Sequence, residues 1–267
     1  MIKLILTDMD GTLLNSEHKM PEKTIETVEW LHQRGIRFGV ASGREYANIR
    51  SYFPTLAEEM IFIADNGTLV YDRNKEIYVD CIETEEVVKM VESLRQMPNV
   101  WIVLCGKEMT YIECAEAKRE EIERIAGNFY YNIEMVQDAV RLAEEKQILE
   151  ISVFCESGSE IVAPELEWVK EKFQMYVSGP NWIDILNKSA GKGNALKKLQ
   201  EYYGWKEEEC MAFGDYLNDM EMLKYSGQSY AMENAHPQIL AMAKHIAPSN
   251  EKGGVIEVIR REFKIEG

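Results

Sequence analysis

The sequence has no paired cysteine motif. Its five cysteines are odd in number and form no CxxC pair, and its four histidines show no spacing typical of metal ligands. This pattern argues against a disulfide framework and favours reduced thiols in a cytoplasmic protein. We interpret the histidines as structural or surface residues: His18, His32, His236 and His245.

Two further absences narrow the class of protein. No stretch approaches the roughly 18 consecutive apolar residues of a membrane span, and Asp8 interrupts the first apolar run too early for a signal peptide. Basic residues are also scarce, since 30 lysines and arginines face 46 aspartates and glutamates. The resulting net charge of −16 argues against a nucleic-acid binder and against a partner of anionic membranes. An anionic substrate must therefore be captured by local cations.

The sequence does contain enough apolar residues, 46% of 267, for a substantial core. Before residue 81 and after residue 189, runs typical of buried strands alternate with amphipathic helices. This alternation predicts a parallel sheet with helical crossovers. Residues 82–188 lack this regular alternation of strand and helix, and they are predicted to form an inserted α+β module of normal domain size. The expected architecture is an α/β core, residues 1–81 and 189–267, interrupted by this insert.

The expected elements follow from hydrophobic periodicity and turn residues. Strands are predicted over residues 3–7, 36–42 and 60–65, and a hairpin is predicted around 73–75. In the insert, helices are expected over 83–97, 115–126 and 164–172, and strands over 101–106, 109–114, 148–155, 175–179 and 181–187. The last part is expected to hold helices over 194–203, 219–224, 236–243 and 254–262, and strands over 210–215 and 229–232.

Two carboxylates follow the first predicted strand. Asp8 and Asp10 are separated by one residue, so in extended backbone both face the same side. They should project into the crevice beyond the carboxyl ends of the strands, where open α/β sheets bind ligands. Gly11 permits a tight turn, and Thr12 adds a hydroxyl. The alternative is an ordinary solvated turn, because Asp-Gly is a common turn signal.

Three more polar stretches follow predicted strands. Ser42 and Gly43 offer a hydroxyl and backbone N–H groups at the start of a helix, which suits a phosphate, although Ser42 could be a simple N-cap. Lys192 lies between two glycines at a helix start, against the helix dipole. The fourth stretch forms a second acidic cluster: Asp215, Asn218 and Asp219. Together these residues supply carboxylates for Mg²⁺ and donors for a phosphoryl group.

These motifs resemble those of the haloacid dehalogenase superfamily of phosphohydrolases. DMDGT, ASGR, the lysine of GKGNAL and GDYLND occur in order, while ADNGTLVYD and the tail AMENA…HIAPSNEKGGVIEVI are similar to the Cof-type branch, subfamily IIB. The resemblance spans the chain and implies a Rossmann-like core with residues 82–188 as a cap domain for substrate specificity. It also implies that Asp8 is a nucleophile forming an aspartyl-phosphate and that Asp10 is the general acid and base.

The resemblance assigns further roles. Mg²⁺ would be bound by Asp8, the backbone carbonyl of Asp10 and Asp215. Phosphate or substrate would be held by Ser42, Lys192 and Asn218, with Ser42 and Lys192 counted as catalytic. Gly43 and Arg44 are added because of their positions beside Ser42. Thr12, Asp219 and Asn250 would support the site. Arg44 could instead be an ordinary surface arginine, and Asp184 and Asn187 are candidate substrate contacts where the insert returns to the core.

The expected function is a Mg²⁺-dependent phosphatase of small phosphorylated metabolites such as sugar phosphates. A phosphosugar mutase would share the aspartyl-phosphate chemistry, and a catalytically idle metabolite-binding protein is a third alternative. We expect a cytoplasmic monomer or weak homodimer that binds neither nucleic acid nor membranes.

Overall fold

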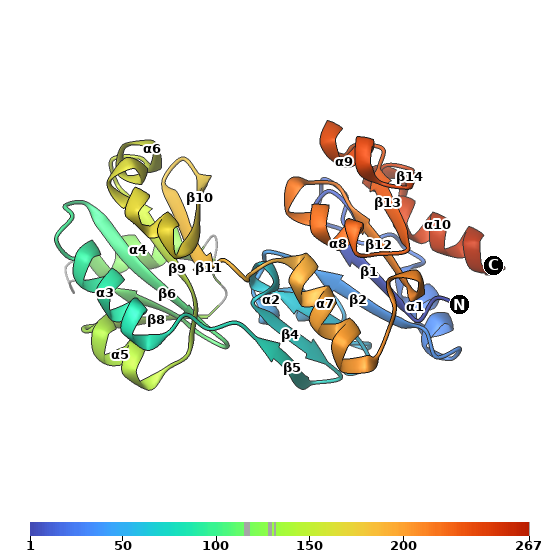
Figure 1. Ribbon diagram of the computed structural model, residues 1–267, viewed down its shortest axis with the longest axis horizontal. Helices are drawn as coiled ribbons and strands as arrows, with labels where there is room; N and C mark the ends of the chain where they lie inside the picture. Colours follow the sequence, from blue (N-terminus) through green and yellow to red (C-terminus); the bar gives the residue numbers. More distant parts are fainter. Residues whose placement is uncertain (115–117, 128–129, 131, 267) are drawn as a thin grey trace. The chain divides into compact units, whose positions relative to one another are not determined.

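The computed structural model describes residues 1–114, 118–127, 130 and 132–266. The chain divides into two compact units (Figure 1). The first is discontinuous and comprises Met1–Val79 and Gly191–Gly267, and the second is Asp80–Ala190. Because the chain leaves the first unit and later returns to it, the second unit is an insertion.

The first unit is built on an eight-stranded sheet in the order β14-β13-β12-β1-β2-β3-β4-β5. The six strands from β14 to β3 run parallel, and β4 and β5 continue the sheet antiparallel. The predicted α/β fold with a parallel-sheet core is confirmed. The strands are β1 (Leu4–Asp8), β2 (Arg37–Ala41), β3 (Ile61–Ala64), β4 (Leu69–Asp72), β5 (Lys75–Val79), β12 (Cys210–Gly214), β13 (Gln228–Met232) and β14 (His245–Ala247).

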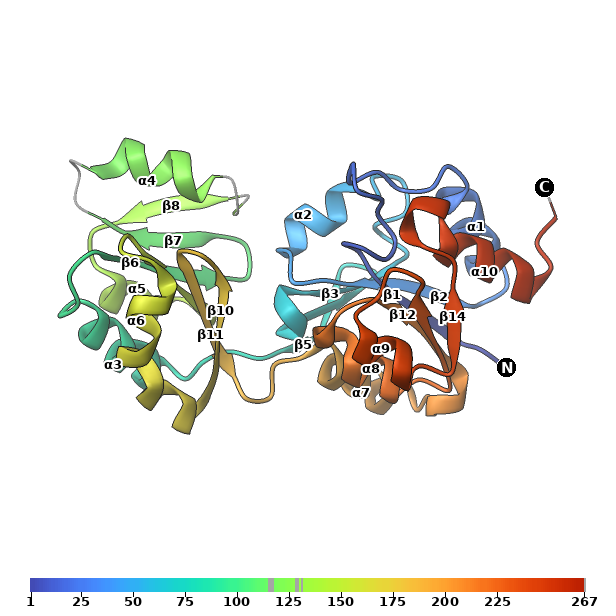
Figure 2. The same cartoon turned by 90° about the horizontal axis from the view of Figure 1, so that it is seen from above.

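Helices cover both faces of this sheet, so its central strands are buried on both sides. In the view of Figure 2, α1, α2 and α10 lie on one face and α7, α8 and α9 on the other. All five residues of β1 and all five of β12 are buried. The helices are α1 (Thr24–His32), α2 (Tyr46–Ser51), α7 (Lys192–Tyr203), α8 (Met220–Lys224), α9 (Pro237–Met242) and α10 (Gly254–Phe263), with short 3₁₀ turns η1 (Asp65–Gly67), η4 (Glu207–Glu209), η5 (Leu217–Asp219) and η6 (Asn250–Lys252).

The inserted unit has a six-stranded sheet in the order β10-β11-β9-β6-β7-β8. Alternate residues of β6 face opposite sides: Ile102 and Leu104 pack with α3 and α5, whereas Trp101, Val103 and Cys105 pack with α4. Each face therefore has its own apolar core. The strands are β6 (Val100–Gly106), β7 (Thr110–Glu113), β8 (Ile133–Val136), β9 (Ile148–Cys155), β10 (Phe173–Gly179) and β11 (Trp182–Asn187), and the helices are α3 (Thr84–Leu94), α4 (Arg119–Ala126), α5 (Ala139–Glu145), α6 (Ser159–Val162) and the 3₁₀ helix η3 (Ala163–Glu171).

Several elements differ from the sequence expectations. The short elements β8, α5 and β14 were not predicted, because four, seven and three residues carry too little periodicity to identify. Of the helix expected over 115–126, α4 accounts for Arg119–Ala126, and residues 115–117 lie outside the described residues. No helix in the described part of the chain has the length and apolar character needed to cross a membrane.

Candidate active site

Most of the predicted site residues lie at the ends of β1, β2 and β12 or in the loops that follow them, whereas Lys192 begins α7 and Asn250 begins η6. β1 lies between β12 and β2 in the sheet, in parallel register, so the three strands end at the same edge. The residues at and just after these strand ends line a cavity of about 300 Å³, namely Asp8, Asp10, Ser42, Gly43, Arg44, Asp215, Tyr216 and Asn218. Seven of these eight were predicted as site residues, and Tyr216, which is 57% exposed, is the addition.

The acids of β1 and β12 meet around a buried lysine. The Nζ of Lys192 lies 2.6 Å from Oδ1 of Asp8 and 2.6 Å from Oδ1 of Asp219. Lys192 is 2% exposed and does not line the cavity, so it contacts Asp8 from the protein interior. Burial alone lowers the pKa of Lys192, but the carboxylates of Asp219 and Asp8 outweigh that effect and hold its pKa above the usual value. The ammonium therefore stays charged.

Asp215 is fixed by its own contacts. Its Oδ1 accepts a hydrogen bond of 2.8 Å from the hydroxyl of the buried Thr12. Gly11 has a φ of +78°, and a Cβ there would lie 2.4 Å from Oδ2 of Asp215. Glycine at position 11 therefore supplies a left-handed turn and also allows the Asp215 carboxylate to approach the backbone.

Asp219 is held by hydrogen bonds to both of its carboxylate oxygens. Its Oδ1 accepts from Lys192, and its Oδ2 accepts from the backbone N–H groups of Asp215 and Tyr216 at 3.0 and 3.1 Å. Both oxygens thus have protein donors, and the side chain is fully buried. Asp8 and Asp215 line the cavity and Asp219 does not, so the first two are the carboxylates that can face a ligand.

This acidic group fits a divalent cation. Oxygen atoms of Asp8, Asp215 and Asp219 all lie within 4.8 Å of one another. When all three carboxyl groups are ionised, they and the one ammonium leave a net charge of −2, which the +2 charge of Mg²⁺ would neutralise. Burial raises the pKa of the Asp8 carboxyl well above its usual value; Lys192 opposes this shift, and Asp219 and Asp215 add to it. Burial likewise raises the pKa of Asp215. Clustered oxygens that are costly to ionise alone are suited to Mg²⁺.

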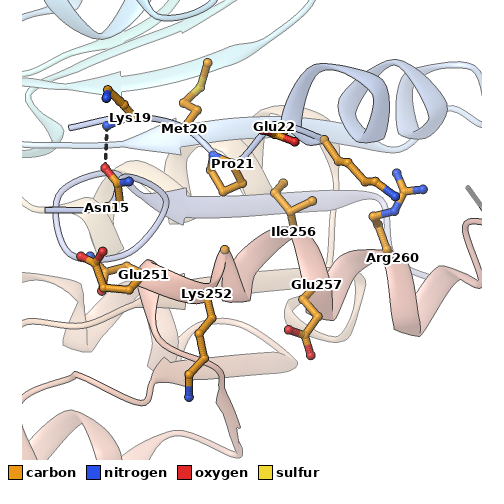
Figure 3. Close-up of a pocket in the computed structure, with 13 residues that line it drawn as sticks. Asn15, Lys19, Met20, Pro21, Glu22, Glu251, Lys252, Ile256, Glu257 and Arg260 are labelled. Atoms are coloured by element: carbon orange, nitrogen blue, oxygen red, sulfur yellow. Dashed lines mark hydrogen bonds between the residues drawn. The ribbon is translucent and has the colours of Figure 1, made fainter. Parts of the chain in front are cut away.

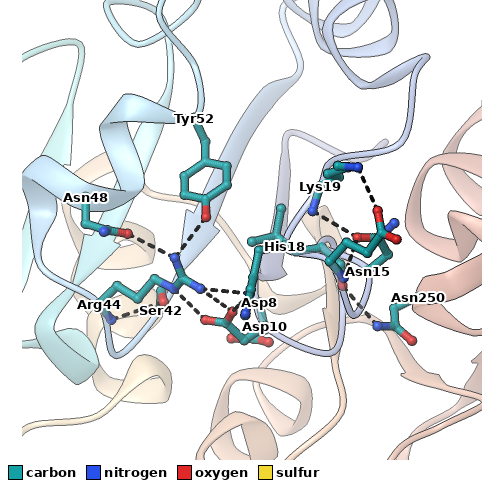
Figure 4. Close-up of polar contacts among 12 residues, drawn as sticks. Asp8, Asp10, Asn15, His18, Lys19, Ser42, Arg44, Asn48, Tyr52 and Asn250 are labelled. Carbon is teal, nitrogen blue, oxygen red and sulfur yellow. Dashed lines mark hydrogen bonds and ion pairs between the residues drawn. The ribbon is translucent and has the colours of Figure 1, made fainter. Parts of the chain in front are cut away.

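Asp10 lines the same cavity and pairs with Arg44 (Figure 4). The guanidinium donates from Nε to Oδ2 of Asp10 at 2.7 Å and from Nη2 to Oδ1 at 2.5 Å. Its Nη1 donates to Asn48 and Tyr52, at 3.1 and 3.0 Å. The sequence predicts that Arg44 binds substrate, but in the structure its guanidinium group donates to both carboxylate oxygens of Asp10. Sequence reasoning missed this pairing, as well as His18, whose Nδ1 lies 3.3 Å from Oδ1 of Asp10.

Asn250 does not reach the acidic group. Its side-chain amide donates to the backbone carbonyl of Leu14 at 3.0 Å, and its backbone N–H donates to the side chain of Asn234. Asn234 in turn donates to the carbonyl of Gly11 at 2.8 Å. These contacts support the loop after β1. Asn250 instead lines a separate hollow of about 520 Å³, between that loop and the start of α10 (Figure 3).

The two candidate substrate contacts of the inserted unit have partners within that unit. Asp184 accepts from the hydroxyl of Ser152 at 2.8 Å, and burial raises its pKa. Asn187 donates to the side chain of Asp80 and to the carbonyl of Cys81, at 2.7 and 2.9 Å. Asn187 therefore ties together the two ends of the insertion.

Comparisons with known proteins show what the chain is similar to. The family model for haloacid dehalogenase-like hydrolases matches residues 5–259. The 5-amino-6-(5-phospho-D-ribitylamino)uracil phosphatase YbjI of Escherichia coli is 32% identical over 266 residues, covering 99% of this chain and 97% of that protein. A crystal structure from Eubacterium rectale is 27% identical with a TM-score of 0.89, covering 98% of this chain and 99% of that one. A sugar phosphatase of subclass IIB is 24% identical with a TM-score of 0.76 over 99% of this chain and 100% of that one, and shows the shared fold.

Proposed function

Because the chain belongs to the haloacid dehalogenase-like hydrolase family and is a phosphatase, we propose that it hydrolyses small phosphorylated metabolites through an aspartyl-phosphate on Asp8, with Mg²⁺ as its cofactor. The family resemblance drawn from the four motifs is confirmed. The observation that carries the proposal is the convergence of Asp8, Asp10 and Asp215 on one cavity, with Lys192 behind Asp8.

In the first step an oxygen of Asp8 attacks the phosphorus atom, and the bond to the leaving oxygen breaks. Asp10, once one of its oxygens has left its hydrogen bond with Arg44 and carries a proton, donates that proton to the leaving oxygen and releases an alcohol. In the second step Asp10 removes a proton from water, whose oxygen attacks phosphorus and frees Asp8 and inorganic phosphate. Such covalent catalysis replaces one difficult displacement with two easier ones.

The remaining residues bind the phosphoryl group, orient Asp8 and hold the cation. Ser42, Gly43 and Asn218 line the cavity beside Asp8 and offer donors to the phosphoryl oxygens. Lys192 keeps the Asp8 carboxylate in a fixed orientation by its 2.6 Å contact. Asp8, the Asp10 carbonyl and Asp215 would hold Mg²⁺, which neutralises charge on the phosphoryl oxygens when bound. Thr12 and Asp219 orient Asp215 and its loop.

The inserted unit is proposed to act as the cap that selects the leaving group. The proposal rests on the place of the insertion in the chain, since Asp80–Ala190 separates the Ser42 motif from Lys192, where the family resemblance places a cap. Sugar phosphates and phosphorylated ribityl compounds are the substrate classes to test first. The second class is suggested by the name of the Escherichia coli relative.

A panel of phosphorylated metabolites tests this function, with kcat/KM ranked across the panel. Release of inorganic phosphate is expected for at least one sugar or ribityl phosphate. Retention of phosphate on an isomerised sugar, with a requirement for a bisphosphate, would identify a mutase instead. Tight binding of a metabolite without turnover would identify a binding protein and contradict the proposal.

Arg44→Gln is expected to lower kcat by about 10²-fold for alkyl phosphates, because Asp10 loses the guanidinium hydrogen bonds that orient its carboxyl group for proton transfer. The loss should be much smaller for p-nitrophenyl phosphate, whose leaving group needs no proton. Arg34→Gln is the control, since Arg34 stacks on Trp30 and does not line the cavity. A rise in KM with the same loss for both leaving groups would instead indicate that Arg44 binds substrate.

A further inference from the structure

The segment Asp65-Asn66-Gly67, between β3 and β4, adopts an unusual backbone conformation. The three consecutive residues have φ values of +48°, +54° and +91°. Positive φ is uncommon for residues with a side chain, and strained backbone of this kind persists only where surrounding contacts hold it. The sequence motif ADNGT contributed to the family resemblance, but no role was assigned to it. We call residues 65–67 the DNG turn.

On one side the DNG turn contacts the loop that carries Ser42. The N–H of Asn66 donates to the carbonyl of Ser42 at 3.1 Å, and the N–H of Asp65 donates to the carbonyl of Arg44 at 3.0 Å. The Asp65 carboxylate also accepts a hydrogen bond from the N–H of Tyr46, at the start of α2. The loop is therefore held at three points along its length.

The Asn66 side chain restricts the same loop sterically. A Cβ added at Gly43 would lie 2.8 Å from Oδ1 of Asn66, so the two segments are in close contact. Asp65 is 7% exposed, and burial raises its pKa well above the usual value. A buried acid is costly to ionise, which indicates that the hydrogen bond from Tyr46 matters to the local structure.

On the other side the DNG turn contacts the residues that begin α7. A Cβ added at Gly67 would lie 2.4 Å from both the carbonyl carbon and oxygen of Gly191, and 2.8 Å from the backbone nitrogen of Lys192. Only a residue without a side chain can pack at this distance. The turn thus separates the Ser42 loop from the Lys192 loop and contacts both.

We propose that the DNG turn is a positioning element that fixes Ser42 and Lys192 relative to each other around the transferring phosphoryl group. The inference rests on the proposed function, in which Ser42 binds phosphoryl oxygens and Lys192 orients Asp8. No residue of the turn lines the cavity, so its effect is transmitted through the two loops. A displacement of about 1 Å at a reacting group can lower a rate by about 10²-fold.

Gly67→Ala tests the Lys192 side of the turn, with Gly35→Ala as its matched control. Gly35 also has a positive φ, +73°, but a Cβ there would meet nothing within 4 Å. Both variants introduce alanine at a left-handed position, and only Gly67→Ala displaces Lys192. We expect kcat/KM to fall by about 30-fold or more in Gly67→Ala and by less than about threefold in Gly35→Ala. Equal kcat/KM in the two variants would overturn the proposal.

Asp65→Ala and Asp65→Asn test the Ser42 side and do not depend on Gly67→Ala folding. Asparagine tolerates a left-handed φ and keeps an acceptor for the N–H of Tyr46, whereas alanine does neither. Asp65→Ala should raise the inhibition constant of inorganic phosphate by about tenfold, and Asp65→Asn should restore it. An unchanged inhibition constant in Asp65→Ala would contradict this side of the proposal.

Ser42→Ala and Lys192→Ala, measured in parallel, separate this inference from the proposed function. If neither substitution lowers kcat/KM, the assigned roles of Ser42 and Lys192 are wrong and the proposed function fails with them. If both lower it while the Gly67 and Asp65 variants behave as their controls do, only the positioning role of the DNG turn is wrong.

Discussion

Asp8→Asn is expected to lower kcat by about 10⁴-fold or more, because the variant has no nucleophilic carboxylate and cannot form the aspartyl-phosphate. Asparagine has nearly the same shape, so the cavity should keep its form. Phosphate release from the best substrate of the panel measures the loss. A variant that retains more than about one hundredth of the wild-type kcat would show that Asp8 is not the nucleophile.

The same substitution should not destabilise the protein. The pKa of Asp8 is raised in the folded state, so its ionised form is less favourable there than in the unfolded chain. A neutral side chain removes that penalty, and Lys192 keeps its 2.6 Å contact with Asp219. The Tm of metal-free Asp8→Asn is therefore expected to equal or exceed that of the wild type.

Asp72→Asn is the matched control for this experiment. Asp72, on β4, is also a buried carboxylate and is 4% exposed. It pairs with Arg37 and accepts a hydrogen bond from Tyr203, and it has no part in the site. Asp72→Asn removes the negative charge that pairs with Arg37, so this variant should melt at a lower temperature but keep its kcat. Asp8→Asn is thus expected to lose activity and keep its stability, whereas Asp72→Asn is expected to lose stability and keep its activity.

The convergence of the acids could be predicted from sequence because it depends on backbone periodicity alone. Asp8 ends the fully buried strand β1, and Asp215 follows the fully buried strand β12, so the parallel pairing of β1 with β12 brings the two acids together. The turn residues Arg73 and Asn74 were equally informative, since both adopt the positive φ that a tight hairpin needs.

Side-chain partners could not be predicted in the same way. Arg44 and Asp10 are 34 residues apart, and their pairing depends on the loop path after β2 and on the contacts with Asn48 and Tyr52. Lys192 was expected among the phosphate-binding groups, and only packing could reveal that its ammonium lies behind Asp8, away from the cavity lining. The DNG turn was visible as a motif, but its two-sided contacts depend on loops separated by over 100 residues in sequence.

Removal of divalent cations is expected to reduce activity to background, and addition of Mg²⁺ should restore it. EDTA treatment followed by titration with Mg²⁺ tests this, with sodium chloride at matched ionic strength as the control for screening. The expectation rests on the two uncompensated charges of the acidic group, which a monovalent salt in bulk solution cannot neutralise at short range. Full activity in EDTA would contradict the cofactor assignment.

Thermal unfolding gives a readout that does not depend on turnover. A cation bound only by the folded chain stabilises it by about 2.7 kcal/mol at a free concentration 100 times Kd. Mg²⁺ should therefore raise the Tm of the wild type, and Asp72→Asn should show the same increase. Asp215→Asn should lose most of it, although its side-chain oxygen can still accept the Thr12 hydrogen bond. Because that bond survives, a lost response to Mg²⁺ would reflect the missing charge, whereas an undiminished response would place the cation away from Asp215.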